Sequence, residues 1–221
     1  MRSYGQYCAV AKALDLVGDR WTLLVVRELL LQDGARFTDL VHGLPGIATN
    51  LLTDRLRELE EHGIVRRQAT PPPVATTLYH LTDSGRELEP VLLALGRFGA
   101  RFMGDPAPAD AFRSHWLSFP VSEFLVDNEP HGPDVTIEVR LGDRPAVIEV
   151  AGGTLRTRPG PVPAPDLVVE GDPPQVLGLL TGRLSLRDAR RDGLRTSGDT
   201  TLLRRVRPGA PSPWAIRADR D

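Results

Sequence analysis

The chain has 221 residues, 41% of them hydrophobic and 25% charged, and 27 Lys and Arg oppose 29 Asp and Glu for a formal net charge of −2. This length suits two domains of about 100 residues each, and the composition excludes a fibrous or disordered chain. Neither half is strongly basic, so binding to a nucleic acid would depend on the local placement of cations.

The N-terminus lacks the apolar segment of a secretory signal, and no stretch approaches the roughly 20 apolar residues of a membrane span. The single cysteine, Cys8, cannot form an internal disulfide and fits a reducing compartment. We therefore expect a cytoplasmic protein that does not enter membranes.

Helical spacing of apolar residues dominates the first half. It predicts four helices, over residues 10–17, 21–31, 37–44 and 47–62. Residues 64–68 and 77–81 alternate as strands do and flank a proline-rich loop, 70–75. Thr82 then caps a long helix with the apolar stripe Leu88, Val91, Leu92, Leu95, Phe98 and Phe102. This order predicts a winged helix-turn-helix domain, residues 1–104, and the stripe predicts a homodimer.

Three motifs make the resemblance specific. They are CAVAKALDLVGDRWTLL at 8–24, RFTDL at 36–40 and LTDRLRELEEHGIV at 52–65. With them, residues 7–103 resemble the HxlR-type transcriptional regulators, a bacterial group related to the MarR proteins. The resemblance implies homodimers that bind double-stranded operator DNA and associate through their terminal helices.

The recognition helix needs an apolar inner face and a polar outer face. With Leu52, Leu56 and Leu59 inward, a rotation of 100° per residue leaves polar side chains outward and at the flanks. The predicted DNA-binding residues are Thr49, Asn50, Thr53, Asp54, Arg55 and Arg57 on this helix, with Arg36, Arg66 and Arg67 as phosphate contacts. Alternatively, Arg55 and Arg57 simply pair with Glu58, Glu60 and Glu61 on a solvated helix. The loop 70–75 contains no Lys or Arg, which argues against insertion of a basic side chain into the minor groove.

Cys8 lies just before the first helix, where the helix N-terminus lowers the pKa of a thiol. Some HxlR-type proteins resemble redox or electrophile sensors that use a cysteine here, so Cys8 is a candidate redox sensor. The alternative is a small buried hydrophobic residue.

In the second half, residues 105–221, the pattern predicts a helix over 109–126 that Pro120 should break or kink. Strands are predicted over 135–140, 146–151 and 154–158. A strand and helix over 166–180, a short helix after 186 and a strand-to-helix step over 193–206 follow. Residues 166–206 resemble the sterol-carrier-protein type-two-like fold through GDP at 171–173, LLTGRL at 179–184 and DGL at 192–194. The expected fold class is therefore α+β, a winged helix-turn-helix domain followed by a sterol-carrier-protein-like α+β domain.

The sterol-carrier-like fold implies an apolar ligand tunnel, which Trp116, Phe119 and Phe124 could line. Aromatic residues at this spacing are also common in an ordinary core. Crowded arginines, at 187, 190, 191 and 195, favour a smaller or anionic ligand over a long lipid.

The sequence contains no arrangement typical of a catalytic triad, phosphate-binding loop or metal site, so we expect neither an enzyme nor a cofactor. The predicted function is a dimeric DNA-binding regulator whose C-terminal domain senses a small-molecule effector or stabilises the dimer. The alternative is a protein that keeps this scaffold without binding DNA and acts through its C-terminal domain as a ligand carrier or an enzyme.

Overall fold

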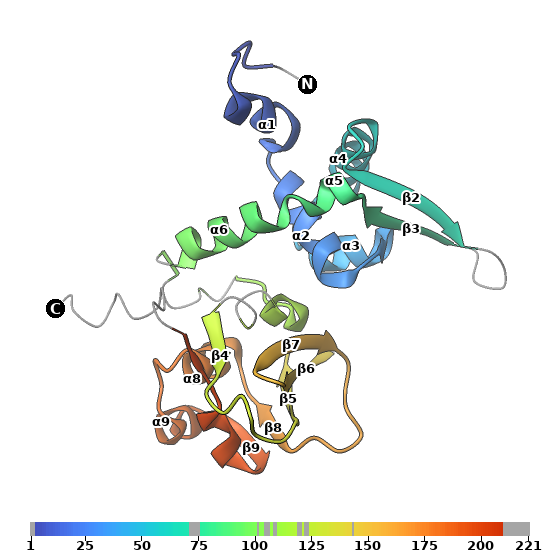
Figure 1. Cartoon of the computed structure of the whole chain (residues 1–221). Helices are drawn as coiled ribbons and strands as arrows, with labels where there is room; N and C mark the ends of the chain where they lie inside the picture. Colours follow the sequence, from blue (N-terminus) through green and yellow to red (C-terminus); the bar gives the residue numbers. More distant parts are fainter. Residues whose placement is uncertain are drawn as a thin grey trace. The chain divides into compact units, whose positions relative to one another are not determined.

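The computed structural model describes residues 3–70, 76–100, 102–103, 107, 110–118, 121, 124–142 and 144–209 (Figure 1). The chain divides into two compact units, Met1–Ala94 and Leu95–Asp221. The predicted domain boundary between residues 104 and 105 lies outside the described residues. Each unit is described by itself below.

The first unit contains the four predicted helices, α1 (Ala9–Val17), α2 (Thr22–Gln32), α3 (Phe37–Gly43) and α4 (Thr49–Glu61). The predicted hairpin is also present, as β2 (Val65–Thr70) and β3 (Thr76–Leu81), paired antiparallel with Val65 opposite Leu81. The order of elements is that of a winged helix-turn-helix domain. This part of the fold prediction is confirmed.

A third strand, β1 (Ala35–Arg36), completes the wing sheet in the order β1-β3-β2. The sequence pattern did not predict it, because two residues show no periodicity. Gly34 allows the strand to form: its φ is +121°, and a Cβ atom there would collide with the imidazole ring of His80. Ala35 then pairs with Tyr79 at the edge of β3.

The helix predicted after Thr82 is two helices, α5 (Asp83–Arg86) and α6 (Glu89–Ala100). Thr82 caps the first, since its Oγ1 accepts a hydrogen bond of 3.0 Å from the backbone N–H of Gly85. Pro90 explains the break, because proline has no N–H for the carbonyl of residue 86 and its ring crowds that carbonyl. The apolar stripe is therefore carried mostly by α6.

In the second unit the predicted helix over 109–126 is present only in part, and its predicted ends are wrong. Residues 110–113 are not helical, and a 3-10 helix, η1 (Ser114–Leu117), follows. Ser118, Val121 and Phe124 are helical, and Leu125 begins strand β4 (Leu125–Asp127). The last strand, β10 (Val206–Pro208), pairs with β4 in a small antiparallel sheet and was not predicted. Apolar residues at helical spacing therefore lie partly in helical turns and partly in irregular and extended backbone, which the pattern alone could not distinguish.

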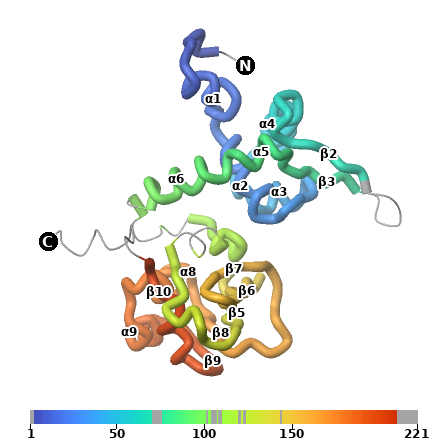
Figure 2. Tube along the Cα trace, in the orientation of Figure 1, coloured from blue at the N-terminus to red at the C-terminus, as the bar shows by residue number. Residues whose placement is uncertain are grey.

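A five-stranded sheet forms the centre of this unit, in the order β7-β6-β5-β8-β9 (Figure 2). Its strands are β5 (Val135–Leu141), β6 (Arg144–Ala151), β7 (Thr154–Pro159), β8 (Leu167–Glu170) and β9 (Arg195–Gly198). β5 and β8 run parallel, while the other neighbours are antiparallel. Gly152 and Gly153, with φ of 54° and 78°, form the predicted tight turn between β6 and β7.

Helices α8 (Pro173–Leu180) and α9 (Leu186–Arg191) precede β9, and a 3-10 helix, η2 (Thr200–Arg204), follows it. One hydrophobic cluster joins these elements: Ile137 and Val139 of β5 lie in it with Leu117 of η1, Val176 of α8 and Ala189 of α9, and each of these five side chains is fully buried. Packed side chains thus occupy the space between sheet and helices in which we expected an apolar tunnel. In the part of the chain that the structure describes, no helix is long and apolar enough to cross a membrane.

Candidate nucleic-acid interface

The inner face of α4 is apolar and buried. Leu52, Leu56 and Leu59 are at most 3% exposed, which matches the spacing of a helix that packs along one side. The predicted outer face is exposed, and its side chains are those of Thr49, Asn50, Thr53, Asp54 and Arg57. The sequence therefore predicted correctly which side of α4 faces solvent.

The turn before α4 determines at which residue the helix begins. Gly46 has a φ of +86°, a conformation that favours glycine, and Ala48 is extended before the first helical residue. Within the first turns the Thr53 hydroxyl donates a 2.9 Å hydrogen bond to the carbonyl of Thr49. That bond uses the hydroxyl proton of Thr53 and leaves its oxygen and its methyl group for an outside contact.

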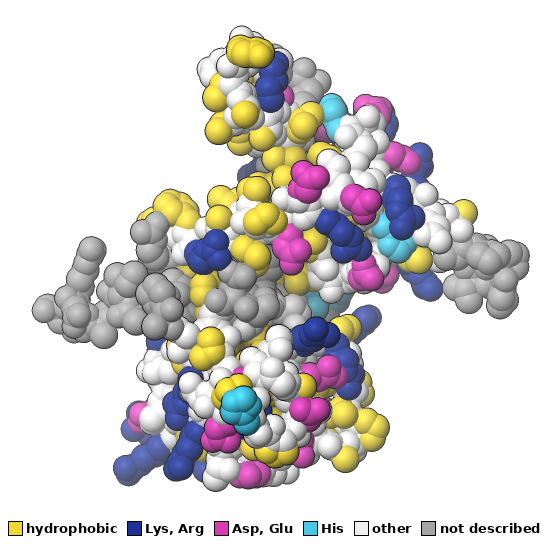
Figure 3. Space-filling view, viewed as in Figure 1, with side chains coloured by type: hydrophobic (Ala, Val, Ile, Leu, Met, Phe, Trp, Pro, Cys, Tyr) yellow, Lys and Arg dark blue, Asp and Glu magenta, His cyan; other side chains and the backbone are white. Residues whose placement is uncertain are grey.

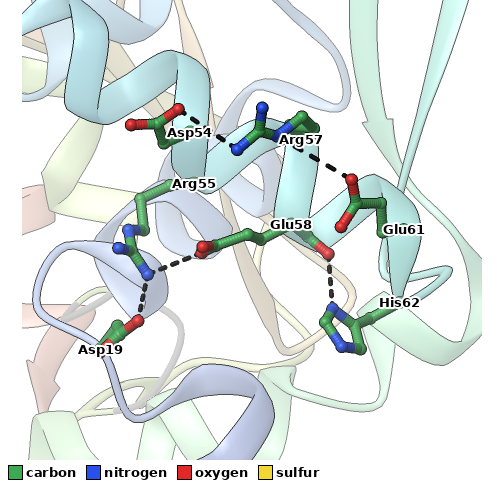
Figure 4. Close-up of polar contacts among 7 residues, drawn as sticks. All are labelled: Asp19, Asp54, Arg55, Arg57, Glu58, Glu61 and His62. Atoms are coloured by element: carbon green, nitrogen blue, oxygen red, sulfur yellow. Dashed lines mark hydrogen bonds and ion pairs between the residues drawn. The ribbon is translucent and has the colours of Figure 1, made fainter. Parts of the chain in front are cut away.

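Arg57 is the loosely held cation of this face. Its side chain is 65% exposed, and its nitrogen atoms lie 3.6 Å from the Asp54 carboxylate and 3.9 Å from that of Glu61 (Figure 4). Both distances exceed that of a good hydrogen bond, and exposed ion pairs contribute at most about 1 kcal/mol. The guanidinium can therefore leave these carboxylates for a base or a phosphate at little cost.

Arg55 is held differently. Its side chain is only 16% exposed, and its Nη1 atom contacts both Asp19, in the loop between α1 and α2, and Oε2 of Glu58 at 2.7 Å (Figure 4). The Glu58 contact is among those the alternative interpretation expected. The contact with Asp19 could not be predicted from the sequence pattern, although Asp19 is part of the motif at 8–24, because 36 residues separate it from Arg55.

The wing carries the other predicted cations. Arg66 is exposed and donates a 3.1 Å hydrogen bond to the side chain of Gln68 on its own strand. Arg67, opposite Tyr79, pairs with Glu60 of α4 at 2.8 Å, and this carboxylate raises the pKa of Arg67. Arg36 is exposed just before α3, where its backbone N–H donates to Asp39. The loop 71–75 lies outside the described residues.

Cys8 lies at the N-terminal end of α1 and its side chain is exposed, so the alternative of a buried hydrophobic residue is wrong. The nearby backbone N–H groups of Ala11 and Val10 lower the pKa of the thiol, as expected where helix N–H groups favour a thiolate. Among the described residues, no group of three or more His, Cys, Asp and Glu side chains could hold a metal ion.

A family model described as HxlR-like helix-turn-helix matches residues 16–106. The chain is also 41% identical, over 100 residues, to the uncharacterized HTH-type transcriptional regulator sll1512 of Synechocystis, a match covering 45% of this chain and 73% of that protein. The chain belongs to the HxlR-like helix-turn-helix family. The relatives that match are named transcriptional regulators, not enzymes, and this confirms the predicted class of protein.

A second relative agrees with this membership in the HxlR-like family. The uncharacterized HTH-type transcriptional regulator YvaP of Bacillus subtilis is 34% identical over 99 residues, covering 45% of this chain and 90% of that protein. Among solved structures, the reduced form of the transcriptional regulator YodB from B. subtilis is 29% identical with a TM-score of 0.40, covering 46% of this chain and all of that one. Residues 107–221 lie outside the family match.

A pocket of about 600 Å³ lies in the second unit, at the carboxyl ends of the parallel strands β5 and β8. Its lining is largely charged: Arg140, Glu170 and Arg195 lie near the sheet, while Asp172 and Asp192 come from loops. Glu170 lies 3.9 Å from Arg140 and 3.5 Å from Arg195, so charges of both signs alternate there. This lining suits a polar ligand better than a sterol.

Two of the three residues we predicted to bind a ligand, Trp116 and Phe124, are not part of this pocket. Trp116 packs edge-on against Phe112, with ring centroids 5.9 Å apart, and Phe124 is 7% exposed. Phe119 lies outside the described residues. Of the four crowded arginines, Arg195 lines the pocket, while Arg190 bonds to Thr196 and Arg191 pairs with Asp188.

Proposed function

We propose that this protein is a homodimeric transcriptional regulator that reads double-stranded operator DNA with the outer face of α4. The observation that carries the proposal is the two-sided character of this helix, with three buried leucines inside and five exposed polar side chains outside. A helix that inserts into the major groove needs this arrangement. Membership in the HxlR-like helix-turn-helix family supports it.

The five exposed polar residues named on the outer face of α4 each have a partner on DNA that fits their chemistry. Asn50 pairs with adenine, Arg57 with guanine or a phosphate, and Thr49 and Thr53 with base edges or a thymine methyl group. Asp54, on the same face, accepts a hydrogen bond from a cytosine amine. Arg36, Arg66 and Arg67 contact phosphates and position the helix. The guanidinium of Arg57 lies 3.6 Å and 3.9 Å from the nearest carboxylates, so it is free to bind a base and contributes most to the discrimination between bases.

Apolar surface on the terminal helices supports the homodimer. On α6 and just after it, the side chains of Leu95, Phe98 and Phe102 are 46%, 55% and 68% exposed, and on α1 Val10 is 67% exposed. Figure 3 shows hydrophobic side chains gathered over these helices. Exposed apolar surface on a helix marks an interface, and a second copy of the same chain buries these side chains through a twofold axis.

For the C-terminal part, residues 105–221, we propose a sterol-carrier-protein-like domain that binds an effector. The mixed five-stranded sheet with α8 and α9 supports the fold, and the charged pocket supports a small polar effector. An effector that binds one arrangement of the dimer better shifts the population toward it, and thereby changes the spacing of the two α4 helices.

The proposal is tested by fluorescence anisotropy with the full chain and a labelled duplex from the DNA upstream of its own gene. We expect binding that is at least a thousandfold tighter than to a scrambled duplex of equal length, and that weakens steeply as salt rises. Equal affinity for both duplexes, or no binding to either duplex at low salt, would exclude an operator-binding regulator.

A further inference from the structure

Two arginines on α4, two residues apart, differ sharply in their surroundings. Arg57 is 65% exposed and holds its carboxylates loosely, whereas Arg55 is 16% exposed and its Nη1 atom contacts two carboxylates, those of Asp19 and Glu58. Figure 4 shows Arg55 directed toward the loop that carries Asp19. The polar face of α4 therefore contains one cation bound within the protein and one available for a partner.

The surroundings of Arg55 disfavour contact with DNA. A phosphate that approached its guanidinium would also approach two carboxylates, and like charges at close range repel. The Nε atom of Arg55 is buried and has no hydrogen-bond partner among the described residues, so this N–H does not face solvent. Withdrawal of the side chain would leave Asp19 and Glu58 without their cation.

The link from Arg55 to Asp19 supplies something that the apolar face of α4 cannot. Leu52, Leu56 and Leu59 hold the helix against the core, but apolar contact is non-directional and tolerates small rotations of a helix. A charge-assisted contact to a guanidinium is directional. Asp19 belongs to the short loop between α1 and α2, 36 positions earlier in the chain, so the contact ties α4 to a separate element.

We propose that Arg55 is a positioning residue: through Asp19 it sets the rotation of α4 about its axis, and it does not touch DNA. This inference rests on the proposed function. It assigns Asp19, an acidic residue, a favourable role in DNA binding, which is opposite to its electrostatic effect on a polyanion. The sign of the effect of removing Asp19 is therefore decisive.

The experiment measures the affinity of the full chain for the upstream duplex across a range of salt concentrations. Asp19→Asn removes a negative charge, yet we expect it to weaken binding about tenfold, which corresponds to about 1.4 kcal/mol. Arg55→Ala should weaken binding by a similar factor with an unchanged salt slope, because no phosphate contact is lost. The double variant should be no weaker than Arg55→Ala alone, since both changes break one contact.

Three controls make the result specific. Glu61→Gln removes a carboxylate that is 63% exposed on the same helix and is assigned no contact with DNA, so it should leave affinity unchanged or raise it. Arg66→Ala removes a proposed phosphate contact and should reduce the salt slope by about one. Arg55→Lys, which keeps the charge, should give an intermediate affinity, and it preserves the test if Arg55→Ala proves unfolded by circular dichroism.

The two proposals fail in different ways. If the wild-type chain does not bind the duplex, the proposed function is wrong. If the wild-type chain binds, but Asp19→Asn tightens binding and Arg55→Ala or Arg55→Lys lowers the salt slope as Arg66→Ala does, Arg55 contacts DNA and the inference is overturned.

Discussion

The guanidinium of Arg205 donates two hydrogen bonds to the carboxylate of Asp127, of 3.1 Å from Nε to Oδ1 and 2.7 Å from Nη2 to Oδ2. Both side chains are buried, with 2% and 0% of their surface exposed. Arg205 also donates to the carbonyl of Pro133, and Asp127 accepts from the backbone of Glu129. The pair lies at the small sheet of β4 and β10, so it joins the end of β4 to the residue just before β10.

Asp127→Asn should destabilise this unit by about 3–5 kcal/mol, because it leaves the Arg205 charge buried without a counter-charge. Urea denaturation followed by circular dichroism measures the loss. Glu149→Gln is the matched control: its carboxylate pairs with Arg158 at 2.6 Å but is 41% exposed, so its removal should cost less than about 1 kcal/mol. Equal effects of the two substitutions would contradict the role of burial.

The same pair predicts a pH dependence. Hydrogen bonds from Arg205 hold the pKa of Asp127 below its usual range. The folded pKa is therefore lower than the unfolded one, near 4, so the pair's contribution is fully present above about pH 4 and is lost as pH falls through the folded pKa. Stability measured from pH 6 to pH 2 should fall less steeply in Asp127→Asn than in the wild type. Parallel curves would show that Asp127 titrates normally.

Arg57 and Arg66 should differ in their effect on DNA binding. Arg57→Ala should cost about 1–3 kcal/mol on the preferred operator and little on a scrambled duplex, because it removes a base contact. Arg66→Ala should weaken binding to both duplexes alike, because a phosphate contact carries no sequence information. Anisotropy titrations with both duplexes measure the difference. Full operator affinity in both variants would remove this face of α4 and the wing from the interface.

Phe98→Asp on α6 should convert the dimer to a monomer at micromolar concentration, because it introduces a charge into the apolar surface that the partner covers. Light scattering measures the mass. Glu89→Lys changes an exposed charged residue on the same helix and should leave the dimer intact. A wild-type chain that scatters as a monomer would refute dimerisation through this surface.

Cys8 should react as a thiolate at lower pH than an ordinary cysteine, because the N–H groups of Ala11 and Val10 lower its pKa. Alkylation by iodoacetamide, followed by mass spectrometry, reports on this residue alone because the chain has one cysteine. The midpoint of rate against pH should lie lower for the folded chain than in urea. Equal midpoints would argue against Cys8 as a redox sensor.

Much of the first unit could be predicted from the sequence because its information is local. Apolar residues three and four apart mark one face of a helix wherever the helix later packs, so α1 to α4 and the inner face of α4 were predicted within a few residues. The motif at 52–65 also identified the family. Thr82 was predicted as a cap, since a cap depends on residues two or three positions away.

The tertiary structure decided which distant groups meet. Arg55 and Arg57 are the same residue type on one helix, and no local pattern separates them, yet Asp19 holds one and solvent surrounds much of the other. Arg205 binds Asp127, 78 positions earlier in the chain, and β5 pairs in parallel with β8 although two strands lie between them in the sequence. Such contacts depend on the tertiary fold, and a periodic pattern along the sequence does not show which distant residues come together. For the same reason the pattern over 109–126 did not show that the helical part is limited to some of these residues and that Leu125 begins a strand.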